Sequence, residues 1–267
     1  MRAELVAGAQ VVARTADILK LVSQRSGSGH LVRDLVHRSG ITRPTVYRLL
    51  SALQACGLVE QDPSSRRWHL GPEAYVLGTL AADRYSIKRL AHNALIRIAD
   101  ATGESSFLSV RRGSESVCLT REEGSYPIRT HVLQPGDRLP LGVGSAGAAI
   151  LAALNDAEIT GLIMSRTQYE PRFSRYSAAT IKDALVETRK LGYAVNRGLL
   201  LPGSWGVAAA VRDGSGNPVA ALSITAIESR LQGDRLQEVG SLLRREALEL
   251  EARITSGLLE AGQRDVA

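Results

Sequence analysis

The chain contains only two cysteines, and they lie far apart. Cys56 and Cys118 have no partner at CxxC spacing and no histidine nearby at the spacing of zinc ligands. This argues against a disulfide framework and against a zinc site. We therefore expect reduced thiols, no metal and no other cofactor.

Long apolar runs are missing as well. No segment reaches the roughly 18 consecutive apolar residues that a membrane-spanning helix needs. The first residues also lack the charged start, apolar core and cleavage site of a secretory signal. We expect no membrane partner and a cytoplasmic location.

The composition fits a globular protein with a polyanionic partner. A length of 267 residues with 44% hydrophobic residues favours two domains. The net charge is +6, and residues 1–84 hold 11 Lys and Arg against 7 Asp and Glu. The basic excess thus lies mainly in the smaller half, although ordinary solvated surface also produces an imbalance of this size.

Residues 31–57 predict two short helices joined by a turn at Gly40, which is the arrangement of a helix-turn-helix. Thr42 is expected to cap the second helix, and Pro44 suits its first turn. Arg48 should point outward because the opposite side carries an apolar stripe at i, i+3, i+4, i+7 spacing. The stripe consists of Val46, Leu49, Leu50 and Leu53. A pair of amphipathic helices from any helical domain would show the same stripe.

The residues after this segment predict a basic hairpin. Residues 58–61 and 67–70 alternate like strands, and Asp-Pro-Ser-Ser at 62–65 is typical of a turn. Arg66 and Arg67 fall near the tip. A helix-turn-helix followed by such a hairpin is a winged DNA reader, with the hairpin arginines against phosphate or in the minor groove.

The sequence around these elements resembles a known family. The run GITRPTVYRLLSALQACGLVEQDPSSRRWHLGPEAYVLG is similar to the DNA-binding half of the isocitrate lyase regulator (IclR) family of bacterial transcription factors. LPLGVGSAGAAILAAL, the Gly-Tyr-Ala-Val step at 192–195 and GVAAAVRDGSGNPVAALSIT follow in the family's order. The resemblance implies an α+β two-domain fold, with an N-terminal winged helix-turn-helix and a C-terminal GAF-like effector-binding domain.

The expected elements fit that division. A first helix over 14–24 completes a DNA-binding domain at 1–72, a helical linker follows at 73–87, and the effector-binding and dimerisation domain covers 88–260. In that second domain we expect strands at 105–113, 116–122, 127–132, 192–196, 205–212 and 219–225. Helices are expected at 145–154, 178–191 and 234–256.

Residues 142–147 match the pattern GxGxxG, which raises the alternative of a dinucleotide-binding protein or an enzyme. The fingerprint needs a preceding buried strand and an acidic residue about 20 positions later, and Pro140 disfavours a central strand here. A Gly-rich loop that opens a helix still presents several N–H groups to one small anion, although the glycines also permit simple close packing. The second half offers two histidines, His92 and His131, and no nucleophile or metalloprotease motif, so we expect no enzyme.

The resemblance implies positions for the effector contacts. Ser145 and Ala146 would contribute backbone donors, and Leu139 and Trp205 would form walls. The other contacts fall on Asn196, Gly206, Ser223 and Thr225. Ser223 and Thr225 share one face of a strand. Many members carry an acidic residue in place of Asn196 and Cys or Ser in place of Gly206, so the pocket is reshaped. A Trp205 that faces inward would favour an aromatic or larger ligand, whereas an outward one would not.

These observations predict a ligand-responsive transcriptional regulator, either repressor or activator, with double-stranded operator DNA and a small organic acid or aromatic metabolite as partners. Base edges would be met by Arg43, Thr45, Tyr47 and Arg48, and the DNA backbone by Arg66, Arg67 and Arg14. The resemblance implies a homodimer, with contacts from the linker and the first helix, that can pair into a tetramer. A protein-binding adaptor is a further alternative, which a steep salt dependence of DNA affinity would oppose.

Overall fold

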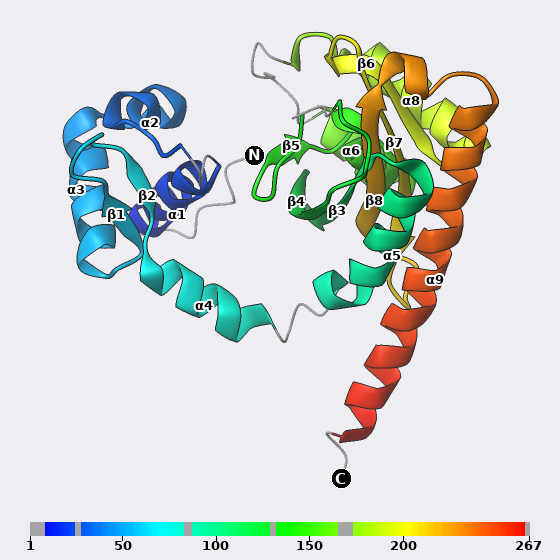
Figure 1. Ribbon diagram of the computed structural model, residues 1–267. Coiled ribbons are helices and arrows are strands. Elements are labelled where there is room, and N and C mark those ends of the chain that lie inside the picture. The colour runs from blue at the N-terminus through cyan, green and yellow to red at the C-terminus, as the bar shows by residue number, and fades with distance from the viewer. Residues whose placement is uncertain (1–8, 25–27, 83–86, 129–131, 165–172, 265–267) are drawn as a thin grey trace. The chain divides into compact units, whose positions relative to one another are not determined.

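The computed structural model describes residues 9–24, 28–82, 87–128, 132–164 and 173–264 (Figure 1). The chain divides into two compact units between residues 86 and 87. This division falls inside the stretch 73–87 that we expected to be a linker.

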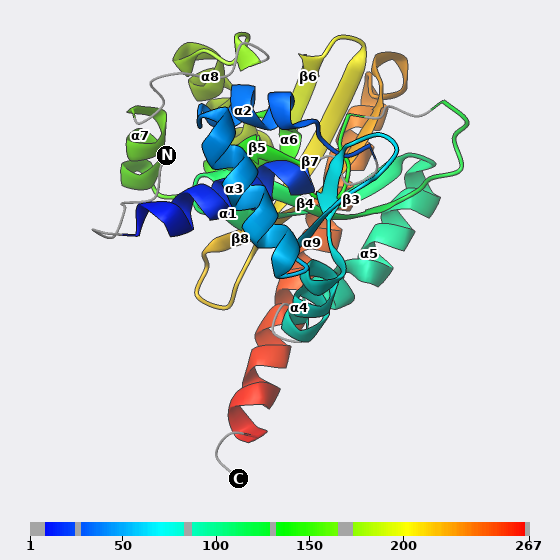
Figure 2. The same ribbon diagram turned by 90° about the vertical axis from the view of Figure 1, so that its left-hand side faces the viewer.

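The first unit consists of helices and a two-stranded antiparallel hairpin (Figure 1, Figure 2). Its elements are α1 (Gln10–Ser23), α2 (Val32–Ser39), α3 (Arg43–Ala55), β1 (Val59–Gln61), β2 (Trp68–Leu70) and α4 (Pro72–Ala82). The core contains Ile18, Val22, Leu35, Val46, Leu50, Leu53, Val59 and Trp68. The predicted stripe of α3 is thus buried, with Leu49 partly buried beside it. The helix-turn-helix with its hairpin is confirmed, although α1 begins four residues before the predicted start.

The ends of the two central helices follow from their sequence. Gly40 and Gly57 take the left-handed conformation, with φ of 66° and 70°, directly after α2 and near the end of α3. Pro44 lies in the first turn of α3, as predicted. The expected cap was wrong: the Thr42 hydroxyl forms a 3.0 Å hydrogen bond with the hydroxyl of Thr45 and does not accept from the backbone.

The second unit is built on a six-stranded antiparallel sheet in the order β5-β4-β3-β8-β7-β6. The strands are β3 (Ser105–Arg112), β4 (Glu115–Glu122), β5 (Arg138–Pro140), β6 (Ala194–Leu201), β7 (Ser204–Arg212) and β8 (Pro218–Ile227). The helices are α5 (Ile87–Thr102), α6 (Gly144–Ala152), α7 (Asp156–Met164), α8 (Ala178–Leu191) and α9 (Asp234–Arg264), with a short 3-10 turn, η3 (Glu228–Arg230). This is the α+β architecture that we predicted.

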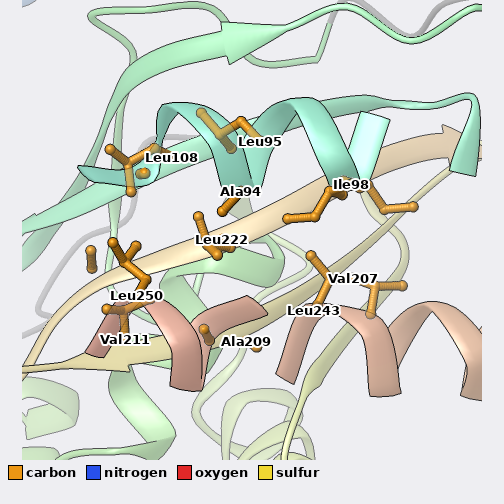
Figure 3. Close-up of a cluster of buried hydrophobic side chains, with 14 of the residues drawn as sticks. Ala94, Leu95, Ile98, Leu108, Val207, Ala209, Val211, Leu222, Leu243 and Leu250 are labelled. Carbon is orange, nitrogen blue, oxygen red and sulfur yellow. The ribbon is translucent and has the colours of Figure 1, made fainter. Parts of the chain in front are cut away.

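Helices cover both faces of this sheet. Alternate residues of β7 serve opposite faces: Val207 and Ala209 pack toward α5 and α9, and Ala208 packs toward α6. Figure 3 shows the first of these cores, in which Leu95 and Leu243 from the two helices meet the sheet. The other core joins α6, α7 and α8 to β6, β7 and β8.

An ion pair ties α5 to α9. The Arg97 Nε donates to both carboxylate oxygens of Glu246 at 3.1 Å. The Glu246 side chain is only 5% exposed, whereas Arg97 is 47% exposed and also reaches Glu249. The guanidinium therefore neutralises a buried carboxylate between the two helices.

The sequence misassigned some segments. The strand expected at 127–132 is absent at Pro127, Ile128 and Val132, and its centre, residues 129–131, lies outside the described part of the chain. The strand at this edge is instead β5, where Pro140 is tolerated because an edge residue needs no N–H for the sheet. α7 and β5 were not predicted. None of the described helices combines the length and apolarity that a membrane span requires.

The dinucleotide hypothesis for residues 142–147 was wrong. A dinucleotide fold requires a parallel βαβ unit, whereas every strand pair of this sheet is antiparallel. The strand that precedes the loop is the three-residue edge strand β5.

Candidate functional site

The outward side of α3 carries the predicted base-reading residues. Arg43 and Arg48 are exposed, Tyr47 is 39% exposed and Thr45 is half-buried. Together they form one surface because the opposite side of α3 fills the core. Two cations and a phenol on one helix face suit a groove that is lined with hydrogen-bond acceptors and flanked by phosphates.

The tip of the β1–β2 hairpin is ordered by Asp62. Its carboxylate accepts hydrogen bonds from the backbone and hydroxyl groups of Ser64 and Ser65. These bonds, led by the Ser65 N–H, hold the pKa of Asp62 well below its usual range. The turn places Arg66 in the left-handed conformation, with φ of 58°, and leaves it exposed.

The two hairpin arginines have different environments. The Arg67 guanidinium turns back and donates to the carbonyl oxygens of Ser28 and Gly29, at 3.3 and 3.2 Å. Arg67 therefore fastens the hairpin to the segment between α1 and α2. Arg14 is exposed on α1.

The second unit contains a cavity between α6 and the face of the sheet that α6 covers. The cavity volume is about 40 Å³. The lining residues come from β3, β4, β6, β7, β8, α6 and the segment before α6. They are Ser109, Ser116, Cys118, Val132, Leu133, Leu139, Val143, Gly144, Ser145, Ala146, Asn196, Leu200, Ser204, Trp205, Gly206, Ser223 and Thr225. All eight predicted effector contacts are among them.

Strand register explains this grouping. Asn196, Gly206 and Thr225 pair in one row across β6, β7 and β8. Ser223 lies two residues from Thr225 on β8, and Ser109 pairs with Ala221 in the row beyond it. Residues two apart on a strand share a face, so these polar side chains all rise from the floor of the cavity.

The first turn of α6 presents two unused backbone donors. A helix leaves its first N–H groups without intrahelical partners. The N–H of Val143 donates to the Pro140 carbonyl at 2.9 Å, and that of Gly144 donates to the Tyr176 hydroxyl at 3.2 Å. Within the described chain, no hydrogen bond uses the N–H groups of Ser145 and Ala146. These are the two donors that the sequence predicted for an effector.

Three buried serines in this cavity also have no partner. Ser109 and Ser223 are each 2% exposed and Ser145 is 8% exposed. No hydrogen bond between described residues involves any of their hydroxyls. These residues line the cavity, so a ligand or water there can make the hydrogen bonds that the protein does not.

The lack of a side chain at Gly206 makes room for Ser145. A Cβ added at Gly206 would lie 2.8 Å from the Ser145 Oγ and 3.4 Å from its Cβ. Ser145 therefore occupies space that a larger residue would fill. The glycine thus leaves the Ser145 hydroxyl room against β7.

Asn196, in the β6 part of the cavity floor, is held by hydrogen bonds within the protein. Its Nδ2 donates to the Tyr176 hydroxyl at 2.7 Å, and its Oδ1 accepts from the Leu200 N–H at 3.4 Å. The Tyr176 hydroxyl therefore accepts from both Asn196 and the amino end of α6. The amide thus links β6 to the start of the helix.

Trp205 borders the cavity, but its indole lies on the opposite face of the sheet. It packs against the core between the sheet and α5 and α9, and the Arg197 guanidinium lies 5.8 Å from the ring centroid. Gly206, next to it on β7, faces α6. The preference for an aromatic ligand that an inward tryptophan would create is therefore removed.

Among the described residues that line the cavity, none is Lys, Arg, His, Asp or Glu. Cys118 is the one titratable group of this described set, and burial raises the pKa of its thiol to about 12, with a contribution from the charge of Asp137. The thiol is therefore neutral at ordinary pH. Among the described residues, no cluster of His, Cys, Asp or Glu is arranged to hold a metal.

Sequence reasoning missed several lining residues. Ser109, Ser116 and Cys118 belong to strands that were predicted, and their alternation with Leu108 and Val110 was readable, but nothing in the sequence showed which face the cavity occupies. Tyr176 had no local signal, because its hydroxyl reaches α6 across 32 residues of sequence.

Comparison with known proteins gives the same two-part division. The family model of the IclR helix-turn-helix domain matches residues 11–63, and that of the bacterial transcriptional regulator IclR C-terminal domain matches residues 79–252. The chain is 31% identical over 250 residues to the HTH-type transcriptional repressor AllR of Escherichia coli K12, covering 92% of this chain and 91% of that protein. The AllR of Salmonella paratyphi A is 30% identical over 254 residues, covering 92% of this chain and 90% of the relative.

Solved structures share the fold. An IclR transcriptional regulator from Alicyclobacillus acidocaldarius is 26% identical with a TM-score of 0.74, covering 91% of this chain and 97% of that one. An IclR homologue from Microbacterium hydrocarbonoxydans, in complex with 4-hydroxybenzoate, is 18% identical with a TM-score of 0.71, covering 92% and 99%. The chain belongs to the IclR family of bacterial transcriptional regulators and is a DNA-binding regulator, not an enzyme.

Proposed function

We propose that this regulator binds operator DNA through α3 and the hairpin, and that a small organic acid or an aromatic acid in the cavity of the second unit controls that binding. The observation that carries the proposal is the set of buried, unpartnered polar groups around the cavity. A regulator whose sensor unit leaves two amides and three hydroxyls without partners is built to receive a small polar molecule.

The DNA contacts follow from the exposed side of α3. Arg43, Thr45, Tyr47 and Arg48 would meet base edges in the major groove, and the guanidinium of Arg48 suits the paired acceptors of guanine. Arg66 at the hairpin tip and Arg14 would contact phosphates. Arg67, whose Nη1 already donates to the Ser28 and Gly29 carbonyls, would do so only with the rest of its guanidinium. The support for these roles is the exposure of the helix face and of the hairpin tip.

In the cavity, a carboxylate would accept from the N–H groups of Ser145 and Ala146, where the dipole of α6 favours negative charge. Ser223 and Thr225 would add hydroxyl contacts from the floor. The homologue from Microbacterium hydrocarbonoxydans binds 4-hydroxybenzoate, which is an acid of this kind. The effector changes operator affinity only if it binds the DNA-competent arrangement and the incompetent one with different affinity.

We further propose a homodimer that forms through the first unit and acts in the cytoplasm, where operator DNA is found. α1 and α4 expose large apolar side chains, namely Val11, Val12, Tyr75, Val76, Leu77 and Leu80, with Tyr75 78% and Leu80 72% exposed. A helix with apolar residues on every side is normally buried. A second copy of the same helices would bury them, and two such dimers can assemble further.

The test is operator binding by the Arg48→Ala variant of the full chain. A site is first selected from random duplex DNA, and affinity is then measured by fluorescence anisotropy. Arg48→Ala should lower the binding free energy for the operator by about 1 to 3 kcal/mol, through a few base positions. The control Arg245→Ala removes an equal charge from α9 and should leave operator affinity unchanged. Equal weakening on scrambled DNA would assign Arg48 to phosphate, and no dependence of affinity on salt would reject the DNA-binding surface.

A further inference from the structure

The cavity has polar residues beyond those that the resemblance supplies. Ser109 on β3 and Ser116 on β4 line it together with the thiol of Cys118. Ser109 is 2% exposed, and no other described residue makes a hydrogen bond to its hydroxyl. Ser116 is 4% exposed and makes one long bond, to the Leu139 carbonyl at 3.4 Å. This end of the cavity therefore holds unused hydrogen-bonding capacity of its own.

The polar residues at the two ends of the cavity, Ser145 at one end and Ser116 at the other, lie on opposite sides of α6. On one side the Ser145 hydroxyl rests over Gly206 of β7. On the other side the backbone of Gly147 packs near Ser116, whose Oγ would lie 3.5 Å from a Cβ at that glycine. Ser109 lies diagonally across from Ser223 in the β3–β8 register, a separation of roughly 7 to 8 Å between Cα atoms. The lining also includes apolar side chains, among them Leu133, Leu139 and Val143.

The electrostatics of the two ends differ. The amino end of α6, with its free N–H groups, favours a negative charge. At the β3–β4 end the described lining includes no helix amino end and no charged side chain, and its polar groups are hydroxyls and a neutral thiol. Placing a charge there without a counter-charge would be costly, whereas a hydroxyl, carbonyl or amide can pair with Ser109 and Ser116.

We propose that the effector is an elongated monocarboxylic acid whose far end carries an uncharged hydrogen-bonding group, and that Ser109 and Ser116 select that group. This inference rests on the proposed function, because it assumes that the carboxylate lies at the first turn of α6. It adds a second point of recognition and excludes dicarboxylic acids and amino acids with a charged far end.

The test compares matched acids on the full-length protein by isothermal titration calorimetry. The aliphatic probes are hexanoate, 6-hydroxyhexanoate, adipate and 6-aminohexanoate, and the aromatic pair is benzoate and 4-hydroxybenzoate. Within at least one pair the hydroxylated acid should bind roughly threefold to tenfold more tightly than its parent, the gain of one buried hydrogen bond. Adipate and 6-aminohexanoate should bind more weakly than hexanoate.

Two serine variants on β3 separate recognition from structure. Ser109→Ala should abolish the gain from the hydroxyl, so that each hydroxylated acid binds no more tightly than its parent. Ser106 lies on the opposite face, and its hydroxyl donates to the Leu95 carbonyl at 2.8 Å. Ser106→Ala should therefore lower stability while keeping the discrimination between the two acids.

The outcomes separate the two proposals. If the parent acids bind, and bind more weakly to Ser223→Ala, the proposed effector site is supported. If in that case the hydroxylated acids bind no more tightly than their parents, or adipate binds best, the recognition of the far end by Ser109 and Ser116 is wrong. If Ser109→Ala weakens both members of a pair equally, the selective role of Ser109 is likewise wrong. If none of the acids binds, the acid-binding site itself is refuted, and this inference fails with it.

Discussion

The contact between Ser145 and Gly206 predicts a strong dependence of one mutation on the other. In Gly206→Ala, the new Cβ would lie 2.8 Å from the Ser145 Oγ, closer than real contacts allow, and 3.4 Å from its Cβ, an ordinary contact. The Ser145 Oγ is the end of a short side chain that can rotate, so the cost lies at the lower end of the overpacking range of about 1 to 3 kcal/mol, and replacing a strand glycine returns roughly 0.5 to 1 kcal/mol. We expect a net loss of at most about 1 kcal/mol in the free energy of unfolding.

The same substitution should be harmless once the Ser145 hydroxyl is gone. In a Ser145→Ala background, Gly206→Ala meets only the 3.4 Å contact, so we expect no loss, or a gain of up to about 1 kcal/mol. The coupling in the double-mutant cycle should therefore be about 1 to 2 kcal/mol. Urea unfolding followed by tryptophan fluorescence, in which Trp205 reports on the second unit, measures all four proteins. An equal cost of Gly206→Ala in both backgrounds would refute the proposed contact.

Three further predictions concern other parts of the molecule. In a thiol-labelling assay, the native protein should show one rapidly reacting thiol, that of the exposed Cys56. Cys118 has a pKa of about 12, so its thiolate fraction at pH 8 is on the order of 10⁻⁴. Two rapidly reacting thiols without denaturant would contradict this. The lowered pKa of Asp62 stabilises the hairpin turn at pH values above the ordinary carboxyl range, and this contribution is lost only as pH falls through the lowered value. Amide exchange at the turn should thus stay slow at pH 4 and become fast in Asp62→Ala, and unchanged exchange would remove the role of the carboxylate. Arg97→Ala should lower unfolding free energy by about 2 to 4 kcal/mol, more than Glu246→Ala, because it leaves a buried carboxylate unpaired; the reverse order in urea titrations would count against the pair.

The helix-turn-helix could be predicted because its signals are local. The stripe from Val46 to Leu53, the glycine after each helix and the Asp-Pro-Ser-Ser turn each act within a few residues, and the structure has all of them. The failed cap at Thr42 shows the limit of such reasoning. The Thr42 hydroxyl could bond either to a backbone N–H of α3 or to the Thr45 hydroxyl, and it bonds to Thr45.

The cavity could be predicted only in part, because its residues meet through the register of distant strands. The eight positions implied by the resemblance all line it. Ser109 and Tyr176 were missed because their roles depend on which face α6 covers and on a contact far apart in sequence. The orientation of Trp205 follows from the pairing with Arg197 across β6 and β7, which the sequence alone does not fix.

The hydrogen bonds of Arg67 limit how the β1–β2 hairpin of the first unit can move. Two hydrogen bonds from its guanidinium fix the hairpin to the chain between the first two helices. Because of these bonds, the β1–β2 hairpin does not move independently of the helices of the first unit. Under the proposed effector control of a dimer, a change in operator affinity would then follow from movement of the whole first unit. It would alter the spacing between the two half-sites and not the fit to each one.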